Sequence, residues 1–199
     1  MSTNPSEAPD LADVFRAYPH GVPELLAYHD ILLRGASDLS VAQRELIAAY
    51  VSGINACGFC FGAHSIIAST FGVSEDLIRA LVDDLDAAPV EQRLKSLLYY
   101  VGKLTRTPAR VTEQDRAQVY AAGWSARALH DAVATCALFN FMNRLVEGMG
   151  VRTSSAIQAA QRERHGAAPQ QNDPSPYMNY GRRIGVVPPL PDVPQPDDT

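Results

Sequence analysis

Two cysteines and a histidine are the residues of this chain whose types and spacing best suit chemistry. Cys57 and Cys60 are three positions apart, and His64 follows four positions after Cys60. On an α-helix, positions i, i+3 and i+7 lie along one face. Two thiols at this spacing can form a disulfide or share a metal, and a nearby imidazole can accept a thiol proton. The segment therefore indicates redox or metal chemistry.

A carboxylate on the preceding segment, Glu45, is expected to join this group. If the chain reverses direction near Ala56, Glu45 and His64 lie about 16 and 12 Å from the turn, at about 1.5 Å per helical residue. Side chains can cover the difference of about 4–5 Å between the two levels. A carboxylate behind an imidazole fixes the ring and raises its basicity. We therefore predict one cluster of Glu45, Cys57, Cys60 and His64.

Such a cluster can run a dithiol–disulfide cycle. A thiolate that attacks a peroxide becomes a sulfenic acid, which condenses with the second thiol to a disulfide. An external dithiol then reduces the disulfide. The helix dipole favours Cys57 as the attacking residue, whereas proximity to His64 favours Cys60. We give more weight to the specific base, and predict that Cys60 attacks and Cys57 resolves.

A structural zinc site is the main alternative for the same residues. Cys57, Cys60 and His64 supply three ligands, and Cys136 or His130 could be the fourth. The chain has no second Cys pair or His pair, so redox chemistry ranks above zinc, and we expect neither a metal nor a cofactor. A haem attachment motif is excluded because Phe61, not histidine, follows Cys60.

Composition limits the possible partners and the compartment. The chain has 199 residues, 46% of them hydrophobic, and a formal net charge of −5. This charge argues against nucleic acid and anionic membranes as partners. No apolar run approaches the roughly 20 residues of a membrane span, and the start lacks the regions of a secretory signal. With only three cysteines, the chain is no disulfide scaffold. We expect a cytoplasmic protein.

The elements that must position the cluster read as consecutive helices. Ser40 and Gln43 have the spacing of a capping box, and Gly72 stands where a left-handed helix cap is expected. No sustained alternation or hairpin signal predicts a strand, so the fold class is all-α. The predicted helices are 9–18, 22–34, 40–54, 57–71, 75–85, 90–105, 113–122, 125–149 and 154–164.

Three regions are expected along the chain. Residues 1–19 form an N-terminal segment, 20–165 the helical domain and 166–199 a proline-rich tail. Eight of the fourteen prolines lie in the tail, which therefore predicts no helix there. The tail is either disordered or an arm that packs on a neighbouring subunit. The residues that such an arm would use are Tyr177, Met178, Tyr180 and Ile184.

The pattern Glu45-x11-Cys57-Gly58-Phe59-Cys60-x3-His64 resembles the active-site pattern of the AhpD-like alkylhydroperoxidases. These belong to the carboxymuconolactone decarboxylase superfamily, and the resemblance to its peroxidase-related members extends over roughly residues 20–150. The other segments that carry it are 44–47, 52–55, 63–64, 121–125, 130–133 and 139–144.

The resemblance implies a helical bundle with the Cys-x-x-Cys motif at the start of a core helix, assembled into dimers, trimers or hexamers. It implies a peroxidase of the peroxiredoxin type, in which Cys60 is peroxidatic, Cys57 is resolving, and Glu45 and His64 relay protons. The substrate would be a small hydroperoxide and the reductant a lipoyl-type or other dithiol. The best-known members carry a second histidine where this chain has Phe59, so part of their relay is missing. A redox sensor or partner-binding protein on the same fold is the second functional alternative.

Overall fold

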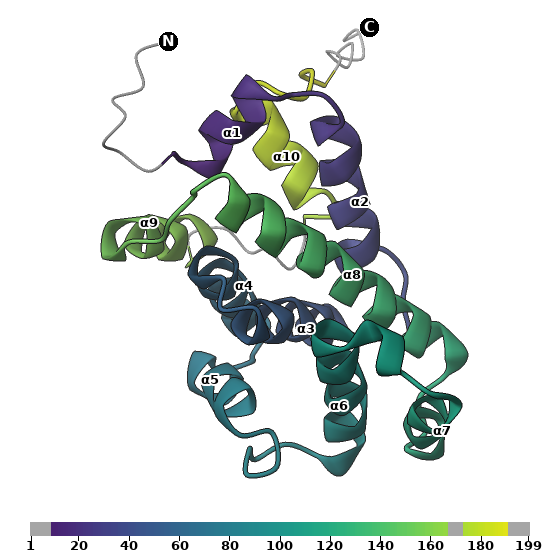
Figure 1. The fold of residues 1–199 in the computed structure, drawn as a ribbon. Helices are drawn as coiled ribbons and strands as arrows, with labels where there is room; N and C mark the ends of the chain where they lie inside the picture. Colours follow the sequence, from purple (N-terminus) through teal and green to yellow (C-terminus); the bar gives the residue numbers. More distant parts are fainter. Residues whose placement is uncertain (1–8, 167–172, 191–199) are drawn as a thin grey trace, which may run out of the picture.

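The computed structural model describes residues 9–166 and 173–190, with side chains omitted for residues 164–166. This part of the chain is all-helical and contains no strand, which confirms the predicted fold class (Figure 1). None of its helices is long and apolar enough to span a membrane. The helices are α1 (Leu11–Ala17), α2 (Val22–Arg34), α3 (Val41–Ile54), α4 (Gly58–Thr70), α5 (Glu75–Asp83), α6 (Gln92–Arg106), the 3-10 turn η1 (Pro108–Arg110), α7 (Glu113–Ala121), α8 (Ala126–Gly148), α9 (Ser155–Gly166) and α10 (Pro176–Arg183).

Each of the nine helices predicted between residues 9 and 164 begins and ends within two residues of the observed helix, α1 to α9. The capping box is confirmed: Gln43 N donates to Ser40 Oγ at 3.1 Å, and Ser40 N donates to Gln43 Oε1 at 2.9 Å. Gly72 has the expected left-handed conformation, with φ of 89°. The boundaries after residues 19 and 165 stay predictions.

The expectation of a tail without helix is wrong for residues 176–183, which form α10. Pro176 is the first residue of that helix, where a missing N–H has no consequence, and the next proline is Pro188. The proposed arm packs on its own chain. The residues that were expected to form the arm are partly buried against the core of the same chain: Tyr177, Met178, Tyr180 and Ile184. The rest of the predicted tail, 167–172 and 191–199, lies outside the described residues.

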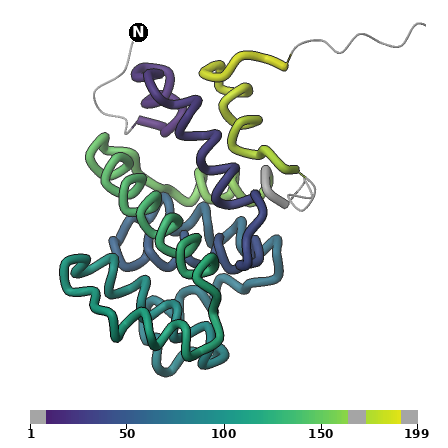
Figure 2. Tube along the Cα trace, turned by 90° about the vertical axis from the view of Figure 1, so that its right-hand side faces the viewer, coloured from purple at the N-terminus to yellow at the C-terminus, as the bar shows by residue number. Residues whose placement is uncertain are grey.

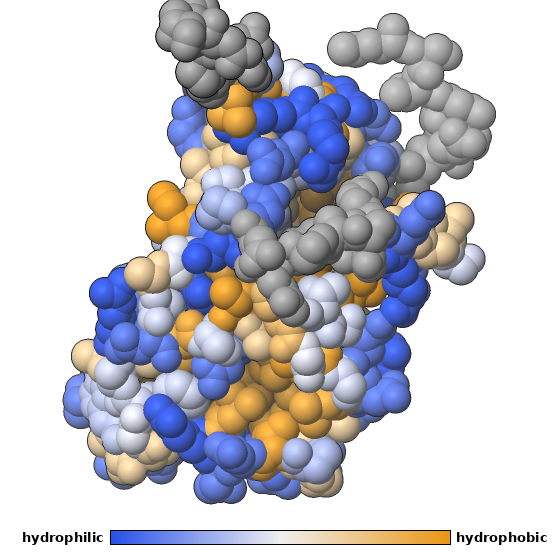
Figure 3. Space-filling model, turned by 180° about the vertical axis from the view of Figure 1, so that it is seen from behind, coloured by the Kyte–Doolittle hydropathy of each residue, from blue (hydrophilic) through white to orange (hydrophobic). Residues whose placement is uncertain are grey.

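Helix α3 is the centre of the bundle and packs against α4, α8 and α6. Its residues Ile47, Ala48 and Val51 have no exposed surface. In Figure 1, α5, α6 and α7 lie on one side of α3, and α1, α2 and α10 lie on the other. Figure 2 shows α10 running alongside α2, with which it makes extensive contact. On the side turned away from the viewer of Figure 1, apolar residues gather in the lower half of the molecule, between hydrophilic margins (Figure 3).

A tight reversal joins α3 to α4. Cys57 N donates to Ser52 O at 2.9 Å, and Ala56 N donates to Gly53 O at 3.0 Å. These two bonds form a Schellman motif, which requires a left-handed residue just after the helix. That residue is Ala56, whose φ is 54° and which is the one non-glycine residue with positive φ in the described part of the chain. The turn leaves no loop, so Cys57 is the N-cap of α4.

Buried Arg44 fixes α3 against the end of α2. Its Nη1 donates to Leu32 O and to Gly35 O, each at 2.8 Å. These carbonyls belong to the last turn of α2 and its C-cap, and have no partner within that helix. A residue on α3 thus caps α2, so the positions of Arg34 on α2 and Glu45 on α3 are fixed relative to each other.

Replacing Ala56 with glycine is expected to stabilise the protein. A side chain in the left-handed region costs roughly 1–2 kcal/mol, which glycine avoids, although its freer unfolded chain offsets part of the gain. We expect Ala56→Gly to raise the free energy of unfolding by up to about 1 kcal/mol in urea titrations. The matched control is Ala117→Gly, at an exposed position inside α7, which should lower it by about 1 kcal/mol. A loss of stability in both variants would contradict the strain assigned to Ala56.

Candidate functional site

The carboxylate of Glu45 is the centre of a buried polar cluster. It has no exposed surface, and it contacts side chains from three other helices. Arg34 Nη1 of α2 donates to Oε1 at 2.5 Å, and His64 Nδ1 of α4 lies 2.7 Å from Oε2. The Tyr177 hydroxyl of α10 donates to Oε1 at 3.4 Å. The predicted pairing of Glu45 with His64 is therefore present in the fold.

Glu45 is ionised in this environment. Burial by itself raises the pKa of the carboxyl, but His64 and Arg34 outweigh it and lower the pKa to about 2. Because a carboxylate can only accept, the hydrogen atom of the Glu45–His64 bond is on Nδ1 of the imidazole. In a neutral imidazole with its hydrogen atom on Nδ1, the other ring nitrogen, Nε2, is an acceptor. Glu45 acts as the group that orients a base rather than as the base itself.

Both thiols lie at the start of α4, buried among core residues. Cys57 has no exposed surface and Cys60 is 4% exposed. The two thiols interact, since each changes the pKa of the other, although Cys57 makes no side-chain cap bond to the helix. His64 follows on the same helix and is 7% exposed. The four predicted site residues thus lie on α3 and α4, on either side of the reversal at Ala56.

The two thiols differ in acidity. Contact with the side chain of Cys60, the largest influence, lowers the pKa of Cys57. The same contact with Cys57, together with burial, raises the pKa of Cys60. In the reduced pair, a single negative charge therefore belongs on Cys57, with the remaining proton on Cys60. Cys57 is the N-cap residue of α4, which is the position near the helix N-terminus that favoured it in the sequence.

Several further residues border the cluster that the sequence did not single out. Arg34 and Tyr177 contact Glu45, and His29 packs on Tyr177 with ring centroids 5.0 Å apart. Asn143 of α8 donates to Ser52 Oγ at 3.0 Å and accepts from Asn55 Nδ2 at 2.9 Å. Asn143 lies in the segment 139–144 that carries the family resemblance, and Tyr177 was expected in an arm, but no motif marks either as a neighbour of the site. Arg34, at the end of an amphipathic helix, could be recognised only once α2 was placed against α3.

Segments after α8 cover the thiol end of α4. A Cβ on Gly58 would lie 3.3 Å from the Thr153 methyl, and one on Gly62 would lie 3.2 Å from the amide of Gln158 on α9. Glycine at these positions therefore permits the close approach of α9. Thr153 and α9 thus cover the part of α4 that carries the thiols.

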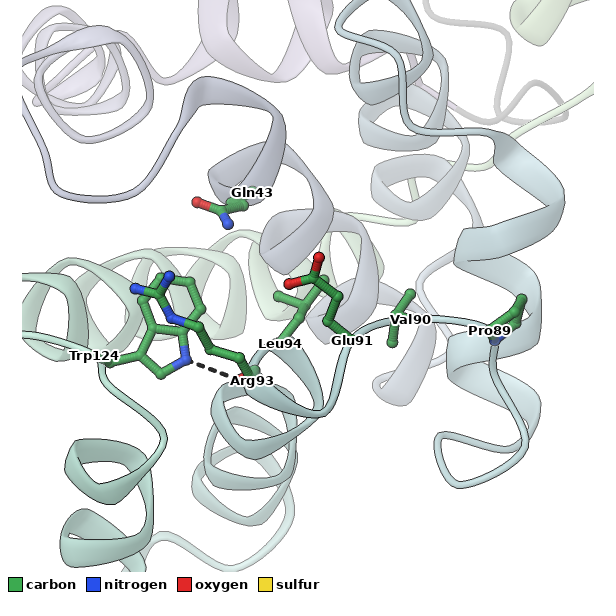
Figure 4. A pocket seen from close by; sticks show the side chains of 7 residues that line it. All are labelled: Gln43, Pro89, Val90, Glu91, Arg93, Leu94 and Trp124. Carbon is green, nitrogen blue, oxygen red and sulfur yellow. Dashed lines mark hydrogen bonds between the residues drawn. The ribbon is translucent and has the colours of Figure 1, made fainter.

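Two surface hollows lie away from these residues. One hollow of about 380 Å³ lies between the start of α3, the start of α6 and Trp124 (Figure 4). There the Trp124 indole donates to Arg93 O at 2.8 Å, and the Arg93 guanidinium stacks 4.1 Å from the ring centroid. A second hollow, of about 570 Å³ and mostly apolar, is formed by α1, α2 and α8. Neither is lined by the four predicted site residues.

Cys136 and His130, the two candidates for a fourth zinc ligand, have other hydrogen-bond partners. The thiol of Cys136 is buried 3.3 Å from Thr105 Oγ1, and His130 is exposed beside Asp131. Over the described ranges 9–166 and 173–190, no group of three or more His, Cys, Asp and Glu side chains is arranged to hold a metal ion.

Residues 22–98 match the carboxymuconolactone decarboxylase family. An uncharacterized peroxidase-related protein from Silicibacter sp. TM1040 is 28% identical, with a TM-score of 0.67 over 73% of this chain and 78% of that one. An uncharacterized peroxidase-related protein from Ralstonia eutropha JMP134, described as an alkylhydroperoxidase AhpD core, is 23% identical, with a TM-score of 0.69 over 75% and 79%.

A protein of unknown function from Agrobacterium tumefaciens, proposed to be the antioxidant defence protein AhpD, is 20% identical, with a TM-score of 0.62 over 71% of this chain and 96% of that one. No curated protein is significantly similar to the chain. The family match covers α2 to the middle of α6, so it includes Arg34, Glu45 and both thiols but not α10.

Stability should fall in acid in two steps. Burial lowers the pKa of His29 to about 4, below the ordinary 6.5. As the pH falls, the His29 imidazole therefore binds a proton in the unfolded chain before it does so in the folded protein. The free energy of unfolding is highest above pH 6.5 and falls by up to about 3 kcal/mol as the pH approaches 4. Glu45, with a pKa of about 2 against 4.5, adds a further loss below pH 4.5. Urea unfolding at a series of pH values measures both.

The slope between pH 6.5 and 4 is assigned to His29 by substitution. In His29→Gln the slope should flatten, whatever the overall stability of the variant, because glutamine does not titrate. His130→Gln removes an exposed imidazole and should leave the slope unchanged. An unaltered slope in His29→Gln would contradict the assignment.

Glu45→Gln should destabilise the protein by about 3–5 kcal/mol, because it leaves the buried Arg34 guanidinium without a counter-charge. The control Glu163→Gln, at an exposed position on α9, should change stability by less than about 0.5 kcal/mol. Equal denaturation midpoints for the two variants would mean that the Glu45–Arg34 pair contributes nothing.

Proposed function

Because the chain belongs to the carboxymuconolactone decarboxylase superfamily and has an AhpD-like fold, we propose that it is a thiol-dependent peroxidase. It reduces hydroperoxides through a Cys57–Cys60 dithiol–disulfide cycle, with Glu45 and His64 as its proton relay. The observation that carries the proposal is the buried Glu45–His64 bond of 2.7 Å, which leaves a basic imidazole nitrogen on the helix that bears both thiols.

Peroxide reduction begins at Cys60, whose proton passes to His64 Nε2. The thiolate attacks one peroxide oxygen, the O–O bond breaks, and the departing alkoxide takes the proton from His64 to form an alcohol. Cys60 is left as a sulfenic acid. Because burial and Cys57 raise the pKa of Cys60, this step needs a base, which agrees with a function for His64.

Cys57 then closes the disulfide. Its lowered pKa makes it the better-ionised thiol, and its thiolate attacks the Cys60 sulfenic sulfur. The S–O bond breaks and hydroxide leaves, taking a proton to become water. One hydroperoxide and two thiols thus give one alcohol, one water and one disulfide. An external dithiol, of the lipoyl type or another, reduces the disulfide and is itself oxidised.

A redox sensor without significant turnover is the second candidate, and the burial of both thiols favours it. Cys57 and Cys60 lie outside the surface hollows, and α9 covers the helix that carries them. Phe59 also stands where the best-known relatives have a second relay histidine. In a sensor, the Cys57–Cys60 disulfide would form once for each oxidation event, and a change of conformation would signal the oxidation.

We also propose that the protein acts in the cytoplasm as a homo-oligomer. Tyr18 and Phe141 are 65% and 52% exposed, and both line the apolar hollow between α1, α2 and α8. A contiguous apolar surface of this kind is typical of an interface between subunits. Light scattering of the wild type against Phe141→Asp tests it, since an interface through this hollow would be lost in the variant.

Single-cysteine variants test the cycle. Cys60→Ser should lower turnover of an organic hydroperoxide with a dithiol reductant by more than about 100-fold, because the attacking sulfur is gone. Cys57→Ser should stop after one oxidation and leave a sulfenic acid on Cys60, which dimedone traps for mass spectrometry. Cys136→Ser, in the core, should keep full turnover.

The outcomes separate the candidates. Stoichiometric disulfide formation without turnover in the wild type would favour the sensor. Full turnover in Cys60→Ser would refute the cycle, and a trapped sulfenic acid on Cys57 in that variant would reverse the order of attack.

A further inference from the structure

Helix α10 brings a hydroxyl to the buried carboxylate from far along the chain. Tyr177 and Glu45 are 132 positions apart, and Tyr177 Oη lies 3.4 Å from Glu45 Oε1. Burial, and then the negative charge of Glu45, raise the pKa of Tyr177 well above its ordinary value, so the hydroxyl keeps its proton and donates it. Oε1 therefore accepts from Arg34 and Tyr177, while Oε2 accepts from His64.

The Tyr177 ring also confines Arg34. The guanidinium carbon of Arg34 lies 5.7 Å from the ring centroid of Tyr177 and 5.3 Å from that of Phe71. Nε and Nη2 of Arg34 are buried and have no hydrogen-bond partner within the described part of the chain. These two aromatic rings, together with the bond to Glu45, thus fix the orientation of a charged group that water does not reach.

The docking of α10 is specified by Asp30 of α2. Its two carboxylate oxygens accept from the backbone N–H groups of Tyr177 and Met178, at 3.0 and 2.9 Å. Asp30 of α2 thus supplies hydrogen-bond acceptors for the backbone N–H groups in the first turn of α10. Further along, Gly181 is buried against Leu26 and Val187, where a Cβ would have no space. Arg16 Nε of α1 donates to Ile184 O at 3.1 Å at the other end.

We propose that Tyr177 is a positioning residue of the relay, and that the site is complete only when α10 is docked. The proposal rests on the proposed thiol chemistry, and it assigns a role in that chemistry to a segment outside the family match, which ends at residue 98. By occupying Oε1 together with Arg34, Tyr177 prevents rotation of the Glu45 carboxylate. Oε2 is then held on the Nδ1–H of His64, and Nε2 is kept unprotonated as the base.

The first test combines Tyr177→Phe with a direct view of His64. The substitution removes the hydroxyl and keeps the ring beside Arg34. Long-range ¹H–¹⁵N spectra should report the Nδ1–H tautomer for His64 in the wild type and a mixture of tautomers in Tyr177→Phe, with the resonances assigned by their loss in His64→Ala. The control Tyr120→Phe, at an exposed position on α7, should give the wild-type spectrum. An unchanged tautomer in Tyr177→Phe would overturn the proposal.

The second test measures thiol reactivity without relying on peroxide turnover. The rate of Cys60 alkylation by iodoacetamide, resolved by mass spectrometry, should fall roughly 3- to 10-fold in Tyr177→Phe, as expected for the loss of an ordinary hydrogen bond, since the bond of 3.4 Å is long. In a His64→Ala background the same substitution should have no further effect, because Tyr177 acts through His64. An equal fall in both backgrounds would mean a purely structural role and would refute the proposal.

The third test undocks α10. Asp30→Ala should speed tryptic cleavage after Arg182 and Arg183 by at least about tenfold and slow Cys60 alkylation as much as Tyr177→Phe does. Faster cleavage with unchanged alkylation would show that the site is complete without α10. If the wild type fails to turn over peroxide, the proposed peroxidase is wrong, but the tautomer and alkylation results still decide the role of Tyr177.

Discussion

The buried carboxylate of Glu45 is the interaction on which the rest of the structure depends. A fully buried charge is tolerated only if other charges and hydrogen bonds compensate it, and here Arg34 and His64 do so from α2 and α4. The pairing ties three helices to one point in the centre of the bundle. It also decides the chemistry, because an ionised Glu45 orients His64 and leaves the second imidazole nitrogen available. Stability and function therefore rest on the same contacts.

The register that makes this pairing possible comes from a turn without a loop. The Schellman motif at Ala56 reverses the chain within two residues, so α3 and α4 run side by side and Glu45 lies level with His64. The same turn places Cys57 at the N-terminus of α4, one helical turn before Cys60, whose side chain lowers the pKa of Cys57. One backbone reversal thus produces both the relay and the difference in acidity between the two thiols.

The burial of the site links its chemistry to motion. Both thiols and the relay are shielded from water, which strengthens the electrostatic contacts within the cluster. In the proposed peroxidase, a substrate would have to displace the segments that cover α4, and α9 lies directly over Gly62. On the opposite side, α10 closes the cluster by docking on Asp30. The two ends of the site are therefore closed by parts of the chain that follow α8, although the reactive residues all precede it.

The sequence by itself determined the helices of residues 11–166, the capping box at Ser40 and the meeting of Glu45 with His64, because helix periodicity, caps and rise per residue are local properties. It did not reveal α10, because prolines on both sides concealed a helix that begins at one of them. Nor did it reveal Arg34, Tyr177 or Asp30 as neighbours of the site. Their contacts join residues up to 148 positions apart and arise only when α2, α3 and α10 pack together. Only the tertiary structure could decide the charge state of Glu45 and which thiol is more acidic, because both depend on burial and on partners from distant segments.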